Sequence, residues 1–230
     1  MKPDIAVIDE INSACRLGEV RVDDLAVGPS SPALLARMSE QSQMLRATYG
    51  GAGVGRIDRV QAVRTMYRQL HMDPHHTRPS SEALLRRVFR GEDLPCVNCI
   101  VDAANLWSVS TLCPVGLYDA ARISGPVALR FGQKGEGYEG IRRDWINVSD
   151  RPGLFDDKGP FGNPTGDSLR TAVTESTIDV LAVAFQPHEF PAIEVADLEA
   201  AIRASQVNDL VPRRAVEPES VNQDDVHAPY

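Results

Sequence analysis

The apolar residues of this chain change their spacing close to residue 112, and this change limits the folds that the chain can adopt. Before it, apolar side chains recur three and four residues apart, which is the spacing of one face of an α-helix. After it, the short β-type runs 127–132, 144–149 and 179–185 are separated by glycine, proline and aspartate clusters, a pattern typical of strands and turns. The sequence therefore predicts an α+β protein in which a helical half packs against a strand-rich half.

The pattern predicts four helices in the first half, at 30–50, 58–71, 79–90 and 98–111, with a strand before them at 4–11. The glycine run 50–55 joins two of these helices and is not followed by G-K-[ST], so it is interpreted as a flexible connection and not as a phosphate loop. A last helix is predicted over 195–204. Residues 211–230 are rich in proline, acid and amide and are expected to form a disordered acidic tail, which leaves one domain over 1–210.

The charge of the chain is unevenly distributed. The formal net charge is −8, which argues against constitutive, sequence-independent binding to nucleic acid. Between residues 56 and 90, however, eight arginines face only three acidic residues. This stretch is either a docking face for a polyanion or a pair of solvated helix faces. If it is a docking face, the expected nucleic-acid contacts are Arg64, Arg68, Arg86, Arg87 and Arg90.

The cysteines and the apolar runs indicate the compartment. Nothing resembling a signal peptide precedes the four cysteines, and no run approaches the roughly 18 apolar residues of a membrane span. We therefore expect a cytoplasmic protein with reduced thiols and no membrane partner. Cys96 and Cys99 form one C-x-x-C pair, but a structural zinc site needs four ligands, so ordinary buried thiols are favoured over a metal. No nucleophile motif or cofactor motif is present, and no cofactor is expected.

Five short motifs follow one another in the middle of the chain. They are RPSSEALLRRV (78–88), P-x-x-N-x-x-V-D-x-x-N-L (95–106), P-x-G-x-Y-D (114–119), G-x-x-x-L-R (125–130) with Gly135-Glu136, and DSLRTAVTEST (167–177). With these motifs, residues 56–185 resemble the B3/4 domain of the phenylalanyl-tRNA synthetase β subunit. The chain resembles still more closely the stand-alone proteins that consist of that domain alone, and the stretch GPFGNPTGDS (159–168) is similar to one branch of them.

The resemblance implies a fold and an activity. The fold is α+β, with a β-sandwich of unusual topology flanked by helices. The activity is proofreading, in which tyrosine wrongly attached to the tRNA 3′ end is removed by hydrolysis of its ester. Such chemistry needs an oriented water and donors for the oxyanion, and positioning alone can suffice without a protein nucleophile.

Only some of the family's site residues are present in this chain. A threonine–asparagine pair of the family falls on Ala104 and Asn105, so the asparagine is kept and the hydroxyl is lost. The family's histidine falls on Gly116, and the strand expected to carry the tyrosine-reading glutamate, 181–185, has no carboxylate. Removal of tyrosine in particular is therefore not expected.

Asn105 is the predicted catalytic residue, near the ester. The other polar or motif residues are expected to line a shared pocket for an aminoacyl group: Arg78, Ser80, Glu82, Asp102, Gly116, Arg130, Glu136, Asn163, Asp167, Ser168, Arg170, Thr171 and Thr174. In this set, Arg130 and Glu136 are expected to form an ion pair. The alternative for each residue is a structural role, as a cap, a turn or a salt bridge.

Two functions remain open at this point. The first is a free-standing deacylase of mischarged aminoacyl-tRNA, or a protein that binds the aminoacyl-tRNA 3′ end. The second is a non-catalytic module that binds an amino-acid-like small molecule.

Overall fold

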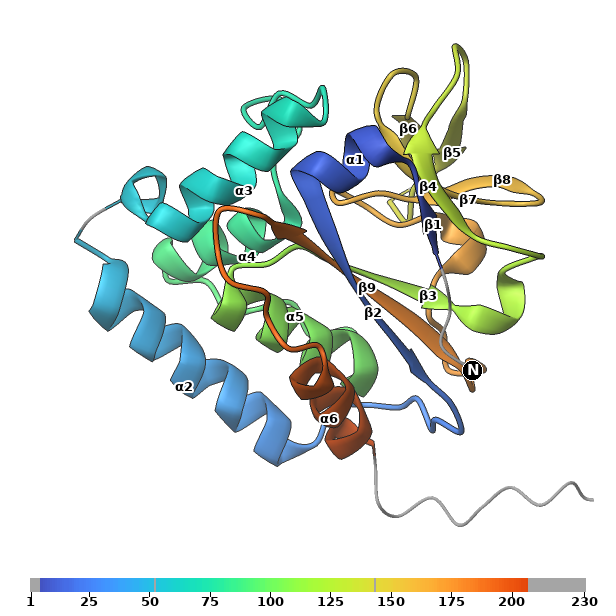
Figure 1. The fold of residues 1–230 in the computed structure, drawn as a ribbon. Coiled ribbons are helices and arrows are strands. Elements are labelled where there is room, and N and C mark those ends of the chain that lie inside the picture. Colours follow the sequence, from blue (N-terminus) through green and yellow to red (C-terminus); the bar gives the residue numbers. More distant parts are fainter. Residues whose placement is uncertain (1–4, 52, 143, 207–230) are drawn as a thin grey trace, which may run out of the picture.

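The computed structural model describes residues 5–51, 53–142 and 144–206 of the chain. The predicted acidic tail, 211–230, lies outside the described residues. The elements follow one another as β1 (Ala6–Val7), α1 (Asp9–Ala14), β2 (Cys15–Val22), α2 (Pro32–Tyr49), η1 (Val54–Arg56), α3 (Asp58–Gln69), α4 (Ser80–Phe89), α5 (Cys99–Thr111), β3 (Val115–Asp119), η2 (Ala120–Arg122), β4 (Ala128–Phe131), β5 (Gly137–Glu139), β6 (Trp145–Asn147), β7 (Pro152–Asp156), β8 (Gly159–Gly162), η3 (Leu169–Thr171), β9 (Val180–Pro187) and α6 (Ala196–Ser205). The fold is α+β, as the change in apolar spacing predicted (Figure 1).

The described strands form three sheets. One has the order β1-β4-β7-β8, the second β2-β9-β3, and the third is the hairpin of β5 and β6. β9 is antiparallel to both of its neighbours, and all eight of its residues are buried. A strand that is buried on both faces must lie inside the fold and not at its surface.

The side chains of β9 alternate between two cores. Leu181, Val183 and Phe185 pack in one core with residues of the four-stranded sheet and of α3. Val180, Ala182 and Ala184 belong to a second core with residues of α5 and α6. The three-stranded sheet is therefore a middle layer between the four-stranded sheet and the helices (Figure 1). This face-to-face packing of two sheets is the β-sandwich that the resemblance implied.

A third core joins α2, α4 and α5 on the side of α5 away from the sheet. Leu34, Leu85 and Val109 contribute one buried side chain from each of these helices. The two longest of these helices begin at capping residues that suit the position. The Ser31 hydroxyl accepts a hydrogen bond from the Leu34 N–H at 3.2 Å, and the Asn98 amide oxygen accepts one from the Val101 N–H at 2.9 Å. The helical part of the sequence prediction is confirmed.

The N-terminal prediction is partly wrong. Only Ala6 and Val7 of the expected strand pair with β4, and α1 begins two residues later. Ile11 and Ala14, three residues apart, are its buried positions, so an alternating pattern concealed one helical turn. The prediction also missed β2, whose apolar residues are interrupted by charged ones although the whole strand pairs with β9. In the described part of the chain, no helix combines the length and the apolar character that crossing a membrane requires.

Candidate functional site

Residues 163–168 form a tight loop between β8 and η3. The Asn163 side-chain oxygen accepts hydrogen bonds from the N–H groups of Thr165 at 2.8 Å and Gly166 at 3.0 Å. This is an asparagine turn, in which the side chain replaces a backbone acceptor. Asn163, a predicted ligand contact, thus shapes the loop.

Three hydroxyl groups from distant elements hold this loop in place. The Tyr67 hydroxyl of α3 donates to the Pro164 carbonyl at 2.7 Å, and the Ser80 hydroxyl at the start of α4 donates to the same oxygen at 3.4 Å. The Tyr138 hydroxyl of β5 donates to the Gly166 carbonyl at 2.6 Å. The motifs that begin at residues 78 and 159 therefore meet in space, although they are far apart in the sequence.

Asp167 places a buried carboxyl at the end of the loop. Its Oδ2 accepts a hydrogen bond from the Leu117 N–H of β3 at 3.2 Å. Its Oδ1 is shielded from solvent without a hydrogen-bond partner, as is the Tyr118 hydroxyl. Loss of hydration on burial raises the pKa of Asp167 to about 7, although the Leu117 N–H and the nearby Tyr118 hydroxyl lower it in part. A carboxyl with this pKa can take up or release a proton at neutral pH.

Two glycines make room for the Tyr118 ring beside this carboxyl. A side chain on Gly116 or on Gly162 would collide with the Tyr118 phenol. The first atom of a side chain on Gly116 would also lie 3.0 Å from Asp167 Oδ1. Asp167 therefore presents its unpartnered oxygen at the place where a side chain of residue 116 would begin.

The side chains after Asp167 are bound by other groups of the protein. Ser168 caps η3, accepting a hydrogen bond from the Thr171 N–H at 3.2 Å, and both side chains are buried. Arg170 forms a two-pronged ion pair with Asp156, with both N–O distances at 2.9 Å. Thr174 is exposed, and its hydroxyl lies 2.9 Å from that of Ser176. In this segment the structural alternative describes the contacts better than a shared pocket does.

Arg130 and Glu136 form the predicted ion pair, with two N–O distances of 2.9 Å. The Arg130 guanidinium also lies 3.5 Å from the centre of the Phe155 ring, a cation–π contact that fixes its orientation. The edge of the Arg130 guanidinium thus pairs with Glu136 and its face packs on Phe155, so both are occupied within the four-stranded sheet and the turn that follows β4.

Two predicted residues of α5 differ in their surroundings. The buried Asp102 carboxylate accepts hydrogen bonds from the Ser30 hydroxyl at 2.6 Å and from the Val97 N–H at 2.9 Å. Asn105 is half-buried, and its amide makes no hydrogen bond with any described residue. The exposed Arg78, ahead of α4, likewise has no ion pair within the described ranges. Asn105 and Arg78 are therefore available to a ligand, whereas Asp102 is not.

Two glutamates form ion pairs with four arginines of the arginine-rich stretch. Four of the five arginines expected to contact nucleic acid are paired in this way: Arg64, Arg86, Arg87 and Arg90. Glu82, only 2% exposed, accepts from Arg64 at 2.6 Å and from Arg86 at 2.7 Å. Burial opposes ionisation of Glu82, but the two arginines outweigh it and hold its pKa below the usual value. The fifth arginine, Arg68, is exposed.

The cysteines form no common site. Cys15, Cys99 and Cys113 are buried, whereas Cys96 is exposed, so the expectation of buried thiols is wrong for Cys96. In the described residues, no three or more histidine, cysteine, aspartate or glutamate side chains gather in a way that could hold a metal ion. The neighbour of Cys96 is Asp102, whose charge raises the pKa of that thiol.

Comparison with known families identifies the central part of the chain. A family model described as the B3/4 domain matches residues 62–196. This chain belongs to the B3/4 domain family. Among solved structures, an N-terminal fragment of the phenylalanyl-tRNA synthetase β subunit from Pyrococcus horikoshii is similar over 89% of this chain, with 12% sequence identity and a TM-score of 0.45. The chain spans about half, 51%, of that fragment. No curated protein matches it significantly.

The B3/4 domain match begins within α3 and ends at the first residue of α6, so it includes Tyr67, Tyr118 and the 163–168 loop. The elements from β1 to α2 precede it. Sequence reasoning placed Asp167 and Ser80 among the site residues but did not identify the tyrosines that hold the loop. For Tyr67, helical spacing indicates only a buried position on the predicted 58–71 helix, because periodicity does not report where a hydroxyl points.

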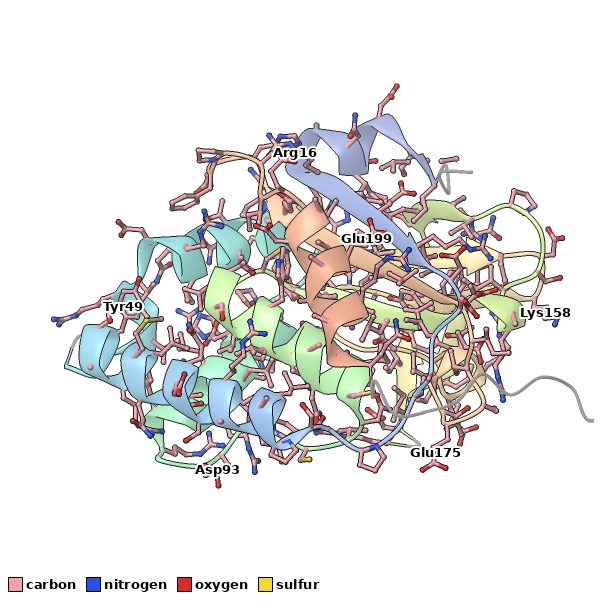
Figure 2. The ribbon with its side chains drawn as sticks, turned by 90° about the horizontal axis from the view of Figure 1, so that it is seen from below. Arg16, Tyr49, Asp93, Lys158, Glu175 and Glu199 are labelled. Carbon is pink, nitrogen blue, oxygen red and sulfur yellow. The ribbon has the colours of Figure 1, made fainter. Side chains whose placement is uncertain are left out.

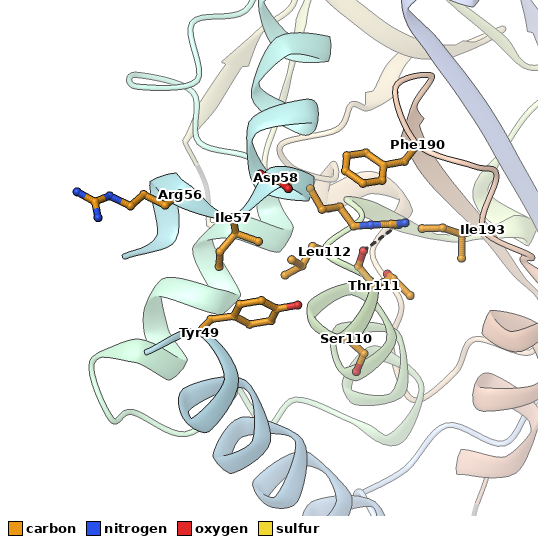
Figure 3. A pocket seen from close by; sticks show the side chains of 10 residues that line it. Tyr49, Arg56, Ile57, Asp58, Ser110, Thr111, Leu112, Phe190 and Ile193 are labelled. Carbon is orange, nitrogen blue, oxygen red and sulfur yellow. Dashed lines mark hydrogen bonds between the residues drawn. The ribbon is translucent and has the colours of Figure 1, made fainter. Parts of the chain in front are cut away.

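A separate cleft of about 590 Å³ lies at the edge of the B3/4 domain match (Figure 3). Its walls come from the end of α2, the start of α3, the end of α5 and the segment before α6. The lining residues are Tyr49, Arg56, Ile57, Asp58, Arg59, Ser110, Thr111, Leu112, Phe190 and Ile193. The cleft lies far from the β7–β8 turn. In Figure 2, Tyr49 at the cleft and Lys158 in that turn are at opposite ends of the molecule.

Sequence reasoning missed this cleft, and none of the predicted site residues lines it. A second cleft, of about 340 Å³, lies between α2 and α5 and also contains none of them. Asn105, Arg130 and the 167–174 segment are therefore not joined by either of these two clefts. That they share a pocket stays a prediction.

Proposed function

We propose that this B3/4 domain protein binds the aminoacylated 3′ end of a tRNA and hydrolyses the ester of a mischarged one. Membership of the B3/4 family and the resemblance to the proofreading domain of the phenylalanyl-tRNA synthetase β subunit support this proposal. The amino acid concerned is not tyrosine, because the strand 181–185 offers no carboxylate to read its hydroxyl.

One observation carries the hydrolytic part of the proposal. The resemblance puts a histidine of the family on Gly116, and this chain lacks that group. Asp167 Oδ1 lies 3.0 Å from where a side chain on Gly116 would begin, and the Asp167 pKa of about 7 is close to that of an imidazole. The carboxyl is thus suited to replace the missing histidine as a proton acceptor.

The proposed reaction returns Asp167 to its starting protonation state, because the carboxylate takes up one proton and later gives it back. The Asp167 carboxylate takes a proton from a water molecule while the water oxygen adds to the ester carbonyl carbon. The resemblance puts Asn105 near the ester, and its amide has no partner among the described residues, so we assign to it the hydrogen bond to the oxygen on which negative charge develops. The bond to the tRNA ribose oxygen then breaks, and that oxygen receives the proton from Asp167. The free amino acid and the uncharged tRNA leave.

Access to Asp167 requires a local movement, because its Oδ1 is shielded from solvent. The Tyr118 ring is fully buried and packs edge-to-face on Phe161, with the ring centres 5.0 Å apart, and its hydroxyl lies beside Asp167. We propose that the aminoacyl group displaces this ring and takes over the contact with Asp167. The RNA backbone would then lie along α3 and α4, where Arg68 and Arg90 are the most exposed of the predicted contacts.

A second candidate function is binding of an amino-acid-like molecule without chemistry. This function is favoured by the burial of the Asp167 carboxyl and by the replacement of the family's threonine by Ala104. An α-amino group would bind to the Asp167 carboxylate as a charge-assisted hydrogen bond. This binding requires no proton transfer to water.

A deacylation panel separates the two candidates. Purified protein is mixed with cognate and non-cognate aminoacyl-tRNAs, and release of amino acid is measured between pH 5.5 and 8.5. For the substrate that is hydrolysed, we expect the rate to rise with pH and to level off above about 7, because the ionised Asp167 is the base. Asp167→Asn should remove this pH-dependent activity, and Asn105→Ala should lower the rate about 100-fold. Glu175→Gln, an exposed carboxylate nearby in the sequence, is the control and should leave the rate unchanged.

The outcome decides between the candidates. Absence of release from every pair, with measurable binding of an amino acid that Asp167→Asn abolishes, would leave only the second function. Release that persists in Asp167→Asn would overturn the role of this carboxyl.

Contact with RNA is tested separately by charge reversal. Arg68→Glu with Arg90→Glu should weaken tRNA binding and reduce the slope of affinity against salt concentration by about 2, since two phosphate contacts are lost. Arg37→Glu on α2, also an exposed arginine, is the control. Equal affinities for the two variants would contradict the proposed path of the RNA.

A further inference from the structure

The β5–β6 hairpin carries the most exposed large apolar side chain of the described residues. Trp145, the first residue of β6, is 65% exposed, whereas the other tryptophan of the chain, Trp107, is 7% exposed. The hairpin lies on the side of the molecule away from α2 and α6 (Figure 1). Tryptophan rings are enriched at surfaces where a ligand or a partner covers them, so the exposure of Trp145 points to such a contact.

The two faces of this hairpin have different surroundings. Tyr138 and Ile146 form one cross-strand pair, and both pack in the same apolar cluster. Glu139 and Trp145 form the next pair. Because neighbouring residues of a strand point to opposite faces, these two lie on the outer face, where both are exposed. The inner face therefore fixes the hairpin, and the outer face presents the indole to solvent.

A glycine on the neighbouring strand gives the indole a place to lie. Gly137 pairs with Asn147, so it is the diagonal neighbour of Trp145 on the outer face. A side chain on Gly137 would begin 2.7 Å from Cε2 and Cζ2 of the indole. The ring thus lies across the hairpin backbone at Gly137, which supports it on one side, while most of its surface stays open to solvent.

The charges of the hairpin cancel. Residues 137–147 contain two acidic and two basic residues, which gives them a formal net charge of zero. The ring, and not a basic patch, is therefore the feature that a ligand would recognise here. A nucleobase suits such a surface, because a base that stacks on an aromatic side chain binds through its π-face and needs no charged partner.

The hairpin is bonded directly to the loop that carries Asp167. The Ile141 N–H donates to the Asp167 carbonyl at 3.2 Å, and Gly140 forms a β-bridge with Ser168. β5 therefore lies between β6 and this segment. Since adjacent strands are about 4.8 Å apart, the backbone of Trp145 is roughly 10 Å from that of the loop. A single-stranded nucleic acid that reaches Asp167 has the indole close to its path.

We infer that Trp145 stacks on an unpaired base in the single-stranded 3′ segment of a tRNA. This inference rests on the proposed function and names the residue that holds the unpaired RNA. The occupant is a base and not a protein surface, because the outer face offers one ring among polar side chains such as Glu139 and Asn147. A stable protein interface buries a much larger area than one ring supplies.

Titration with an uncharged tRNA tests the inference, because this RNA contains no ester and its binding does not depend on hydrolysis. We expect the fluorescence of Trp145 to be quenched as the RNA binds. Trp145→Leu, which keeps only the buried Trp107, should show no quenching and should bind about tenfold more weakly. Its slope of affinity against salt concentration should stay unchanged, because no phosphate contact is lost. Trp145→Phe, which retains a ring, should recover part of the affinity.

The control is Ile178→Ala, which shortens a comparably exposed apolar side chain and should bind like the wild type. A tRNA without its unpaired 3′ nucleotides locates the contact. Removal of these nucleotides should cost the wild type about tenfold more affinity than it costs Trp145→Leu, because the ring and the bases form one contact. Urea unfolding checks that each variant is folded.

The outcomes separate this inference from the proposed function. If Trp145→Leu binds the tRNA as tightly as the wild type, or if both proteins lose equal affinity for the shortened RNA, the inference is wrong and the proposed function is untouched. If the wild type binds no tRNA, both are wrong. Quenching and coupling as expected, without release of amino acid in the deacylation panel, would support the inference and remove the hydrolytic part of the proposed function.

Discussion

Tyr118 and Gly116 lie two residues apart on β3, and the Tyr118 phenol fills the space where a side chain on Gly116 would begin. Residues two apart on a strand point to the same face, so the larger one covers the smaller. The family's histidine therefore has no room at residue 116 while the ring stays where it is. The absence of the histidine and the position of the Tyr118 phenol therefore depend on each other, because the phenol can lie here only when residue 116 has no side chain.

This arrangement predicts a cost for any side chain at residue 116. Gly116→Ala should lower the free energy of unfolding by about 1–3 kcal/mol, because a methyl group must displace a ring that is fully buried. Urea denaturation measures it. Gly51→Ala is the matched control, since no atom lies within 4 Å of the position of its new methyl group, and it should cost almost nothing. Similar losses for the two variants would show that the ring yields freely.

The two fully buried tyrosines of the site should respond differently to loss of the hydroxyl. Tyr67→Phe removes the hydrogen bond to the Pro164 carbonyl and should lower the free energy of unfolding by about 1–2 kcal/mol. The Tyr118 hydroxyl lies beside Asp167 without a hydrogen bond of good geometry, so the loss in Tyr118→Phe should be smaller, below about 0.5 kcal/mol. Thermal and urea unfolding of both variants give the comparison. A loss in Tyr118→Phe as large as in Tyr67→Phe would mean that its hydroxyl is hydrogen-bonded in solution.

Local patterns of the sequence predicted the helices well but predicted the site only in part. The stripe that contains Tyr67 follows from helical spacing, and so does the buried face of α4. The bond from Tyr67 to Pro164 spans 97 residues, and nothing in either local pattern reports that these segments meet. β2 escaped prediction because its pairing with β9, and not its own alternation, keeps it extended. The cleft escaped for the same reason, since four separate segments form its walls.

The arginine-rich stretch shows a second limit of prediction from the sequence. Its excess of positive charge is a property of residues 56–90 in sequence, whereas the charge on the surface depends on the pairs that form. Glu92 lies two residues beyond that window and pairs with both Arg87 and Arg90. Counting charges over a window could not reveal that Glu82 is buried and holds two guanidinium groups.

Glu82 is therefore predicted to matter for stability far more than Glu92. Glu82→Gln leaves the largely buried Arg64 without its counter-charge and should lower the free energy of unfolding by roughly 2–4 kcal/mol. Glu92→Gln is the control, because Glu92 and its two arginines are 39–58% exposed and solvent screens such pairs, so its effect on the free energy of unfolding should be much smaller. Urea denaturation at pH 7 compares them. Equal losses would mean that the Glu82 pairs are screened as well.

The thiols should differ sharply in reactivity. Cys96 is the exposed cysteine, whereas Cys15, Cys99 and Cys113 are buried, and burial raises the pKa of Cys15 to about 12. In the folded protein, 5,5′-dithiobis(2-nitrobenzoate) should therefore react promptly with one thiol, and in urea with all four. The nearby Asp102 raises the pKa of Cys96, so the reaction should accelerate as pH rises above 8. Cys96→Ser should remove the prompt phase, and a remaining prompt phase would show that a second thiol is accessible.

Asp167 should make the protein less stable as the pH rises. Its pKa in the folded state, about 7, is above its ordinary value of 3.8, so between these values the folded state binds more protons than the unfolded state. Its stabilising contribution is complete below pH 3.8 and is lost as the pH rises through 7.

Asp167→Asn keeps an acceptor for the Leu117 N–H but cannot ionise. At pH 8 the variant should be more stable than the wild type by roughly 1–4 kcal/mol, and the difference should shrink towards pH 4. Urea denaturation from pH 4 to pH 8 measures this, with Glu175→Gln as an exposed control whose difference should not vary. A constant difference for Asp167→Asn would mean that the carboxyl ionises normally in the folded protein, and the proposed proton acceptor would then lack its near-neutral pKa.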